Sequence, residues 1–587
     1  MRTALIYPPA AYGYMPYLAP FLLKGYLHAH TGHSAEALDL NAQFHAYTRS
    51  SLYTGDFAPV RLERAGQLLR ELVAHHAEPS FTALRTLATY DDWHAVECHA
   101  RIVKEVRTLV ATTDRAVRAT GRSISGPDTG ALHSKIEATR LTSAGRYLER
   151  WVTAGSADGF DAVGITVTYS EQMLPALALA AELKRRRPAL PIAIGGGAVT
   201  HNLTRLLASP EYFDFVDFIV PYEGESVLGE LLDALEGHAP FPTLNIATRD
   251  QHGAVVYRQD LLGKPKLGPV PDFLDLRPEL YPTPSPIYPL LTSKGCYWGK
   301  CAFCTHHEGY GQGYYRLGDD ALLASLEHVA QLGGDHFYFV DEAIPPRQFQ
   351  QLTEMFRDRA AAGRPARWMA EARLERTMVR PDAVHTLEQS GCVLLVNGIE
   401  SGSQQIVDGM KKGIDLELVA EFARLCSETD SVRTGWMFFV GFPGESERQA
   451  RETFEYITRH AAHVDYAAIG AFSLERGSPI WNDPAHYGIS QIYGRDDPTR
   501  GYFEYELDGV GRSGYFANEA LLSTLREEYP SVKALTDVAV DRAFAMFRPA
   551  RGRGGAAGTA QPRRVRWHDE NGRSVEYFPS RRRFEVA

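Results

Sequence analysis

Three cysteines lie within nine residues, at Cys296, Cys301 and Cys304, directly after the apolar run Pro286–Thr292. They are half of the six cysteines in the chain, and six unevenly placed cysteines in 587 residues do not form a disulfide framework. Thiolates hold iron–sulfur clusters, and a four-iron cluster needs a ligand on each iron. Three cysteines therefore leave one iron open to a small molecule that can receive an electron.

A closed zinc site is the alternative that the same loop allows. A structural zinc ion takes four protein ligands. His306 and His307 follow the third cysteine, and either could supply the fourth ligand. The sequence favours the open cluster and keeps a zinc-stabilised binding protein as a second interpretation.

Length and charge limit the remaining choices. A chain of 587 residues is too long for one ordinary domain and indicates three or four units. The formal net charge of −10 argues against nucleic-acid binding, which favours a basic surface. No apolar run is long enough to span a membrane, and Met1–Tyr7 predicts a strand rather than a secretion signal. We therefore expect a cytoplasmic protein without nucleic-acid or membrane partners.

Strands and helices alternate in residues 1–240, which predicts a doubly wound, Rossmann-like parallel sheet with ligands bound beyond the carboxyl ends of its strands. The expected strands are Thr3–Tyr7, Ala37–Asn41, Ala162–Thr168, Pro191–Gly195 and Phe215–Val220, with helices over about Tyr17–His30 and Glu171–Arg186 and from about Ser226. The interval from about 49 to 155 is too long for a plain crossover, so we expect a helical insertion there.

A second α/β unit is expected over residues 284–477, after a linker at 241–283. Its candidate strands are Ile287–Thr292, His336–Asp341, Arg367–Ala372, Val393–Gly398, Thr434–Val440 and Ala467–Ser473. In barrels of this kind the catalytic groups lie at the carboxyl ends of the strands. Polar or turn residues stand at those ends here, namely Asp341, Glu342, Glu371, Arg373, Glu400, Ser401 and Gly441.

Residues 478–587 form a small C-terminal region of different character. Helices are expected near Asn518–Glu528 and Val538–Phe547, followed by a Gly/Ala/Arg linker at 551–560 and a basic end. We expect either a solvated tail with a hairpin or a contact surface for the substrate or a leader peptide.

The cysteine spacing, Cys-x4-Cys-x2-Cys, resembles the signature of radical S-adenosylmethionine (SAM) enzymes, which usually have three residues in the first gap. The resemblance implies a partial (β/α)6 barrel and a 4Fe–4S cluster on Cys296, Cys301 and Cys304. Phe303 matches an aromatic that commonly lies near the SAM adenine, although a hydrophobic loop anchor explains it equally well. SAM-binding roles are implied for the strand-end residues, with Arg373 clasping the SAM carboxylate. For any one carboxylate, a structural salt bridge is the alternative.

The first domain resembles cobalamin-binding domains in three segments, Val163–Gln172, Ile194–Val199 and Pro221–Glu225. The resemblance implies cobalamin contacts by Thr166, Thr168, Gly195, Gly196, Gly197 and Glu223, with Tyr169 and Gln172 approaching the lower face of the cobalt. The three glycines either let the backbone approach a bulky ligand or form a tight strand-to-helix turn. The loop Pro8–Tyr14 lacks the Asp-x-His-x-x-Gly motif of cobalamin mutases, as do most radical SAM enzymes with cobalamin domains.

Together these features resemble the cobalamin-dependent radical SAM family over residues 1–48 and 156–477. The family mainly transfers a methyl group to an unactivated carbon, with one SAM methylating cobalamin and a second cleaved to a 5′-deoxyadenosyl radical. The resemblance implies three cofactors: the 4Fe–4S cluster, SAM and methylcobalamin. It also implies an electron donor such as flavodoxin or ferredoxin, and a peptide or small-molecule natural-product precursor as substrate.

Two other activities are alternatives to methyl transfer. A family member that performs a rearrangement, a ring contraction or an alkyl transfer would carry the same cofactors. A methylthiotransferase is disfavoured, because the N-terminal domain has no second set of three cysteines for an auxiliary cluster.

Overall fold

The structure is a computed structural model of the chain. It describes residues 1–9, 11, 13–54, 130–260, 270–281, 283, 285–306, 313–496, 502–537, 542–548, 551, 565–568, 574–578 and 583–586. Residues 55–129 of the expected insertion, 552–560 of the expected linker, 538–541 of the last expected helix and His307 lie outside this part. None of the helices in the described ranges has the length and apolarity to cross a bilayer.

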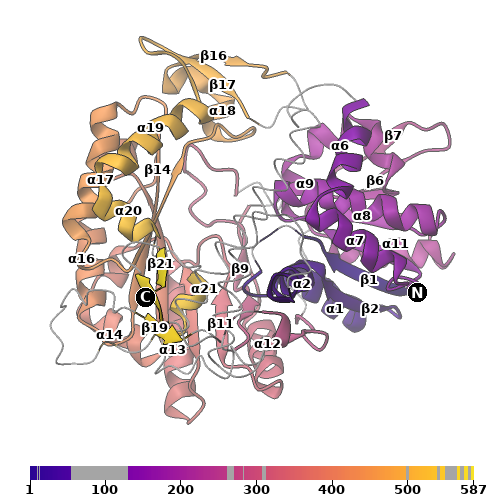
Figure 1. Cartoon of the computed structure of the whole chain (residues 1–587), viewed down its shortest axis with the longest axis horizontal. Helices are drawn as coiled ribbons and strands as arrows, with labels where there is room; N and C mark the ends of the chain where they lie inside the picture. The colour runs from indigo at the N-terminus through magenta and orange to yellow at the C-terminus, as the bar shows by residue number, and fades with distance from the viewer. Residues whose placement is uncertain are drawn as a thin grey trace.

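Seven strands form the sheet of the first domain, in the order β2-β1-β3-β4-β5-β6-β7 (Figure 1). They are β1 (Arg2–Tyr7), β2 (Ser34–Asp39), β3 (Ala162–Thr166), β4 (Ile192–Gly195), β5 (Phe218–Val220), β6 (Ala247–Arg249) and β7 (Val255–Tyr257). The first five strands pair in parallel, which confirms the expected doubly wound fold. The pair β6–β7 is antiparallel and extends the sheet into the segment that the sequence interpretation treated as a linker.

Helices cover both faces of this sheet because side chains alternate along the buried strand β1. Leu5 packs with residues of α1 (Leu18–His30) and α11 (Glu225–Leu235) on one face. Ile6 packs with residues of α7 and α8 on the other face. The helices of that second face are α6 (Gly130–Arg140), α7 (Ser143–Thr153) and α8 (Met173–Arg186).

The second strand ends two residues earlier than the sequence predicted. Asp39 accepts a hydrogen bond at 2.7 Å from the amide of Ala42, and Leu40 begins α2 (Leu40–Thr54). A carboxylate that accepts from an amide three residues ahead is a typical helix start, so the polar residues that looked like a strand end open a helix.

The second domain contains all six strands that the sequence predicted, in one open sheet ordered β15-β14-β13-β12-β11-β8. They are β8 (Tyr288–Leu290), β11 (His336–Phe339), β12 (Arg367–Glu371), β13 (Cys392–Glu400), β14 (Arg433–Val440) and β15 (Tyr466–Ala471). Every neighbouring pair is parallel. The main intervening helices are α12 (Asp319–Gln331), α13 (Pro346–Ala361), α14 (Pro381–Gln389), α16 (Leu416–Ser427) and α17 (Glu447–His460). This is the expected partial (β/α)6 barrel.

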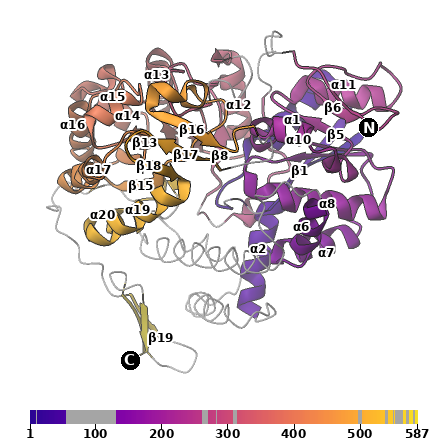
Figure 2. The same ribbon diagram turned by 90° about the horizontal axis from the view of Figure 1, so that it is seen from above.

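The two domains lie side by side and share one hydrophobic core (Figure 2). Phe21 of α1 contacts Phe273 with ring centroids 4.9 Å apart, and Phe273 packs edge-on against Tyr288 of β8. Tyr14, from the loop after β1, packs among the side chains that fill the inside of the barrel, next to Tyr338 and Met369. The apolar contacts therefore fix the two sheets relative to each other.

In its described residues, the C-terminal region adds two small sheets and four α-helices. Strands β16 (Ile489–Tyr493), β17 (Glu504–Leu507) and β18 (Gly511–Gly514) form one antiparallel sheet, and the helices are α18 (Pro479–Asn482), α19 (Tyr515–Glu528), α20 (Pro530–Asp537) and α21 (Arg542–Ala545). At the end of the chain, β19 (Val565–His568), β20 (Ser574–Phe578) and β21 (Arg583–Val586) form a three-stranded sheet rather than a hairpin. It stands apart from the two large sheets in Figure 2.

The three glycines at the end of β4 are required largely by the fold. A Cβ at Gly195 would lie 2.7 Å from the carbonyl oxygen of Val220, on the neighbouring strand. Gly196 has φ +104, and a Cβ there would lie 2.7 Å from the carbonyl oxygen of Val167. Gly197 differs, because its nearest neighbour would be 3.5 Å away, an ordinary contact. The tight-turn interpretation thus accounts for two of the three glycines.

Replacing Gly196 by alanine is expected to destabilise the first domain, whereas Gly197→Ala is not. The first change combines a backbone conformation that only glycine adopts easily with a clash against Val167, at a cost of about 1–3 kcal/mol. Calorimetric unfolding of both full-length variants without added cofactor checks this. Equal unfolding temperatures for the two variants would show that the turn is not strained.

Candidate functional site

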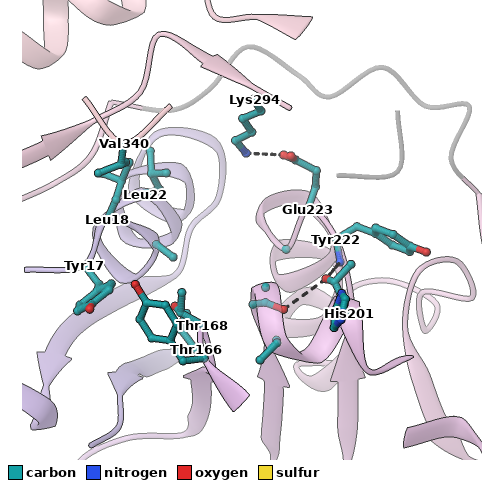
Figure 3. A pocket seen from close by; sticks show the side chains of 18 of the residues that line it. Tyr17, Leu18, Leu22, Thr166, Thr168, His201, Tyr222, Glu223, Lys294 and Val340 are labelled. Carbon is teal, nitrogen blue, oxygen red and sulfur yellow. Dashed lines mark hydrogen bonds and ion pairs between the residues drawn. The ribbon is translucent and has the colours of Figure 1, made fainter. Parts of the chain in front are cut away.

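A cavity of about 1510 Å³ lies between the carboxyl ends of the two sheets. Loops after β1, β3, β4 and β5 form one wall, and the strand ends of the barrel form the other. Figure 3 shows Tyr17 and Leu22 on one side of it and Tyr222 and Glu223 on the other. The predicted site residues in its wall are Thr166, Thr168, Tyr169, Gly195, Gly196, Gly197, Glu223, Asp341, Glu342 and Glu371.

The cavity continues as an apolar slot between the first sheet and the helices α1 and α11. Its two sides are Leu18, Ala19, Leu22, Leu23 and Leu228 from the helices, and Gly164, Ile165, Ala193 and Ile194 from the strands. Gly164 lines the slot where the strand has no side chain. The slot suits a flat apolar or heteroaromatic group, and its mouth carries the hydroxyl of Thr166.

Three tyrosines stack beside the mouth of the slot, and the sequence interpretation had noted only one of them. Tyr7 and Tyr17 stack with ring centroids 4.2 Å apart, and Tyr169 meets Tyr17 edge-on at 5.9 Å. Burial raises the pKa of Tyr7 and of Tyr17 well above the usual range, so both hydroxyls stay protonated. Tyr169 is 40% exposed and faces the cavity.

Gln172 does not face the cavity, contrary to the expectation that it approaches a ligand there. Its side chain is fully buried. The amide oxygen accepts hydrogen bonds at 3.0 Å from the backbone amides of Thr168 and Tyr169, and the amide nitrogen donates to the carbonyl of Pro8 at 2.7 Å. Both halves of the amide group are used to join the loops after β1 and β3.

The cysteine loop borders the barrel wall of the cavity through Thr305 and His306, which directly follow Cys304. Cys296, Cys301 and Cys304 are free thiols of intermediate exposure. Burial raises the pKa of Cys301, and it raises that of Cys304 to about 12, with the charges of the neighbouring thiols adding to the effect. A bound metal cation would oppose this rise in pKa, because cysteine binds metals as the deprotonated thiolate.

The described residues do not form a mononuclear metal site. No three of their His, Cys, Asp or Glu side chains converge on one point. A four-iron cluster places a different iron under each thiolate, so it accepts cysteines that lie apart. The three thiols are a suitable donor set for such a cluster, whereas His307, a possible fourth zinc ligand, lies outside the described residues.

Arg373 holds the cysteine loop in place through contacts with Trp298 and with the segment 410–413. Its guanidinium lies 3.8 Å from the ring centroid of Trp298 and donates to the carbonyls of Lys412 and Gly413, at 2.7 Å for the latter. It also pairs with Glu375. The side chain is 5% exposed, and all three of its nitrogens donate to protein acceptors. Contrary to expectation, Arg373 is therefore occupied in positioning the loop.

The segment 410–413 completes this frame. The carbonyl of Met410 accepts from the amide of Ala302 at 2.8 Å, and the carbonyl of Lys411 accepts from the indole of Trp298 at 2.9 Å. Gly413 has φ +67, and a Cβ there would lie 2.4 Å from Trp298. The segment 410–413 thus holds the cysteine loop through its backbone carbonyls.

Glu400 and Lys412 form a buried pair next to the cysteines, with oxygen and nitrogen 2.7 Å apart and both side chains 13% exposed. Glu400 has φ +74 at an irregularity in the pairing of β13 with β14. Burial alone would lower the pKa of Lys412, but attraction to Glu400 and to the Cys301 thiolate raises it. Lys412 therefore supplies a positive charge beside the thiolates.

The three carboxylates at the ends of β11 and β12 all line the cavity, and Asp341 also holds the cysteine loop. Asp341 is 2% exposed and accepts hydrogen bonds from the amides and hydroxyls of Thr292 and Ser293. Burial raises its pKa to about 6. Glu342 pairs with His306, and Glu371 accepts from the hydroxyl of Tyr338 at 3.0 Å. Asp341 thus anchors the start of the cysteine loop, while Glu342 and Glu371 remain in the wall.

Ser401 and Gly441 are structural as well. Ser401 is fully buried, and its hydroxyl accepts from the amide of Ser403 at 3.2 Å. Gly441 has φ +90 and donates its amide at 2.5 Å to Glu445, whose carboxyl also lies near Ser401. Burial raises the pKa of Glu445 to about 7.

Phe303 packs edge-on against Phe439, with centroids 5.0 Å apart, and belongs to an apolar cluster under the loop. This supports the interpretation of Phe303 as a loop anchor. Sequence reasoning missed His201, Tyr222, Lys294, Glu475 and Arg476, all of which line the cavity. Two of them stood close enough to a motif to be found: Tyr222 lies inside the segment Pro221–Glu225, and Lys294 lies two residues before the first cysteine.

Comparison with known proteins agrees with this architecture. Residues 290–457 match the radical SAM superfamily, so this part of the chain is a radical SAM domain. The bacteriochlorophyllide d C-12(1)-methyltransferase of Chlorobaculum tepidum is 26% identical over 204 residues, which are 34% of this chain and 43% of the relative. The chain thus matches less than half the length of that relative.

Two solved structures share the two-domain fold. The radical S-adenosylmethionine methyltransferase TsrM from Kitasatospora setae, with cobalamin and a 4Fe-4S cluster bound, has a TM-score of 0.52 and 17% identity, covering 85% of this chain and 81% of TsrM. The cobalamin-dependent S-adenosylmethionine radical enzyme OxsB has a TM-score of 0.53 and 13% identity, covering 91% and 66%. At these identities the likeness concerns the fold.

Arg373→Ala is expected to loosen the cysteine loop. The change removes the stacking partner of Trp298 and leaves the carbonyls of Lys412 and Gly413 without their donor, at about 1–3 kcal/mol for each buried group left unpaired. Hydrogen exchange at the Ala302 amide should accelerate at least tenfold. Arg376→Ala is the matched control, since the Arg376 side chain is 80% exposed and 3.6 Å from Asp415. Unchanged exchange in the Arg373 variant would contradict the clamp.

Glu445→Gln should change how stability depends on pH. The folded-state pKa of Glu445, about 7, lies above its usual value of 4.5, so the folded protein binds this proton more tightly than the unfolded chain. The contribution of Glu445 therefore falls as pH rises from 4.5 through 7. The glutamine variant should match the wild type near pH 5 and be more stable at pH 8, by up to about 3 kcal/mol. Thermal unfolding at both pH values measures the difference, and a variant less stable at pH 8 would contradict it.

Proposed function

We propose that the protein is a cobalamin-dependent radical SAM methyltransferase that methylates an unactivated carbon of a peptide or small-molecule natural-product precursor. The observation that carries the proposal is the cavity that the carboxyl ends of the first sheet share with the cysteine-loop side of the barrel. An enzyme that uses two cofactors on one substrate must bring both to one enclosed space.

The first-domain wall supports cobalamin as one cofactor. The apolar slot suits the heterocyclic base of the nucleotide tail, and Thr166 and Thr168 offer hydroxyls near its mouth. Gly197, whose missing Cβ the fold does not require, leaves room for a bulky ring system. Tyr169 faces the cavity from the loop after β3 and would contact that ring from the side of the sheet.

The barrel wall supports a cluster and SAM. Cys296, Cys301 and Cys304 would hold the cluster, and Lys412 would offset part of the thiolate charge. Glu342 and Glu371 line the cavity and would attract the cationic amino group of SAM. Cluster and SAM bound there would supply a radical, and cobalamin would supply the methyl group; an electron donor such as flavodoxin or ferredoxin would complete the system.

The chain's own contribution is to position these groups and to keep water away. Tyr17, Tyr338 and Tyr466 contribute large rings to the wall around the centre of the cavity. Arg373 and the segment 410–413 hold the cysteine loop, and Gln172 holds the loops beneath Tyr169. Because the reaction would depend on positioning, the proposal requires no separate acid–base pair in the described part of the cavity wall.

Anaerobic preparation and reconstitution test the proposal. The wild type should carry about four iron and four sulfide per chain, bind hydroxocobalamin, and convert SAM to both S-adenosylhomocysteine and 5′-deoxyadenosine when substrate is present. Cys304→Ala should lose the cluster and both products but still bind cobalamin. Cys392→Ala is the matched control, because Cys392 is fully buried in β13.

The products distinguish the alternatives. 5′-Deoxyadenosine without S-adenosylhomocysteine would replace methylation by a rearrangement, ring contraction or alkyl transfer. Zinc in place of iron and sulfide would overturn the proposal in favour of a zinc-stabilised binding protein.

A further inference from the structure

Lys294 joins the two halves of the cavity. It stands on the barrel side, two residues before Cys296, and its ammonium group pairs with Glu223 at 2.6 Å and with Glu225 at 2.9 Å. Both carboxylates belong to the loop and helix start after β5 of the first domain. Figure 3 shows the contact between Lys294 and Glu223 across the top of the cavity. The ion pairs therefore link a cobalamin-side loop directly to the cysteine loop.

The contact is buried and reinforced. The side chain of Lys294 is 8% exposed, and that of Glu225 is 13% exposed. The hydroxyl of Tyr315 donates to the second oxygen of Glu223 at 2.5 Å. Tyr315 is also the backbone partner of Lys294 in the two-stranded sheet of β9 (Ser293–Lys294) and β10 (Tyr315–Arg316). Glu223 is thus held by two adjacent residues of the barrel domain.

The backbone around Lys294 leaves little freedom to absorb a movement. Ser293, just before it, is bound through both its amide and its hydroxyl to Asp341. Gly295, just after it, has φ +76 and packs so closely that a Cβ would lie 2.2 Å from the carbonyl oxygen of Gly313. A displacement of Lys294 therefore passes to Cys296 rather than being lost in a flexible hinge.

The ion pairs of Lys294 with Glu223 and Glu225 form only when the two domains are in contact. A movement that broke the contact without admitting water would leave two carboxylates and one ammonium group buried and unpaired, which is strongly unfavourable. The hydrophobic contacts between α1 and the barrel domain are non-directional. Lys294 adds the directional contact that fixes the distance between the two cofactor walls.

We propose that Lys294 is a positioning residue that couples cobalamin binding in the first domain to the ordering of the cysteine loop on its cluster. The proposal rests on the proposed function for the identity of the two ligands. Because coupling between two sites is reciprocal, the cluster should tighten cobalamin binding and cobalamin should tighten retention of the cluster.

The test measures cobalamin binding rather than activity. Hydroxocobalamin is titrated anaerobically into the full-length chain, with and without the reconstituted cluster, and binding is followed by absorption. The quantity compared between variants is the ratio of the Kd without the cluster to the Kd with it. For the wild type we expect this ratio to be about 5 or more, the usual size of such coupling. For Lys294→Met, which keeps most of the length of the side chain and removes its charge, we expect the two Kd values to agree within 2-fold.

Two further variants show that the charge contact is responsible. Lys294→Arg should restore most of the ratio, because a guanidinium can pair with both carboxylates. Lys184→Met is the matched control: Lys184 pairs with Asp217 at 2.7 Å entirely within the first domain, so its loss should leave the ratio unchanged. If Lys294→Met does not fold, Tyr315→Phe serves instead and should lower the ratio by releasing one oxygen of Glu223.

The outcomes separate this proposal from the proposed function. A full wild-type ratio in Lys294→Met, or in Tyr315→Phe where that variant is used, would overturn the coupling while leaving the function intact. A ratio of one in the wild type would overturn it as well. A wild-type chain that binds no hydroxocobalamin in either state would instead overturn the proposed function.

Discussion

The position of the cysteine loop depends on one buried guanidinium. Arg373 stacks on Trp298 and donates to two consecutive carbonyls of the segment that also receives the Ala302 amide. A nine-residue loop with three thiols cannot keep a fixed shape through its own backbone pairs, since it has almost none. Removing a rigid, charged fork of this kind would release both the indole and the carbonyls at once.

Many of the polar residues that follow the barrel strands hold loops of the protein in place. Asp341 binds the first turn of the loop, Glu400 holds Lys412 beside the thiols, and Glu445 fixes the turn at Gly441. In each case the carboxylate oxygens accept hydrogen bonds from, or pair with, other groups of the protein. The ligand-facing carboxylates are therefore fewer than the sequence pattern suggests, and a strand-end position alone does not distinguish the two roles.

The sequence predicted the architecture well because it is encoded locally. Six strands of the barrel and the five parallel strands of the first sheet appear as apolar runs ended by turn residues, and burial on both faces makes such runs distinct. The strands β6 and β7, which extend the first sheet within residues 241–283, were not predicted, because three-residue strands carry too little pattern to be recognised. The roles of Arg373 and Gln172 could not be predicted, since their partners Gly413 and Pro8 are set by tertiary packing.

The opposed arrangement of the two sheets explains why one cavity can combine an apolar slot with a charged wall. In each sheet the parallel strands bring their carboxyl ends, and thus their loops, to the same edge. The first sheet contributes short side chains and glycines, which leave the apolar slot open between the strands β3 and β4 and the helices α1 and α11. The barrel contributes carboxylates and the cysteine loop. Neither edge alone encloses a space of this size, so the contacts that join the domains, apolar at α1 and ionic at Lys294, belong to the site as much as the residues that line it.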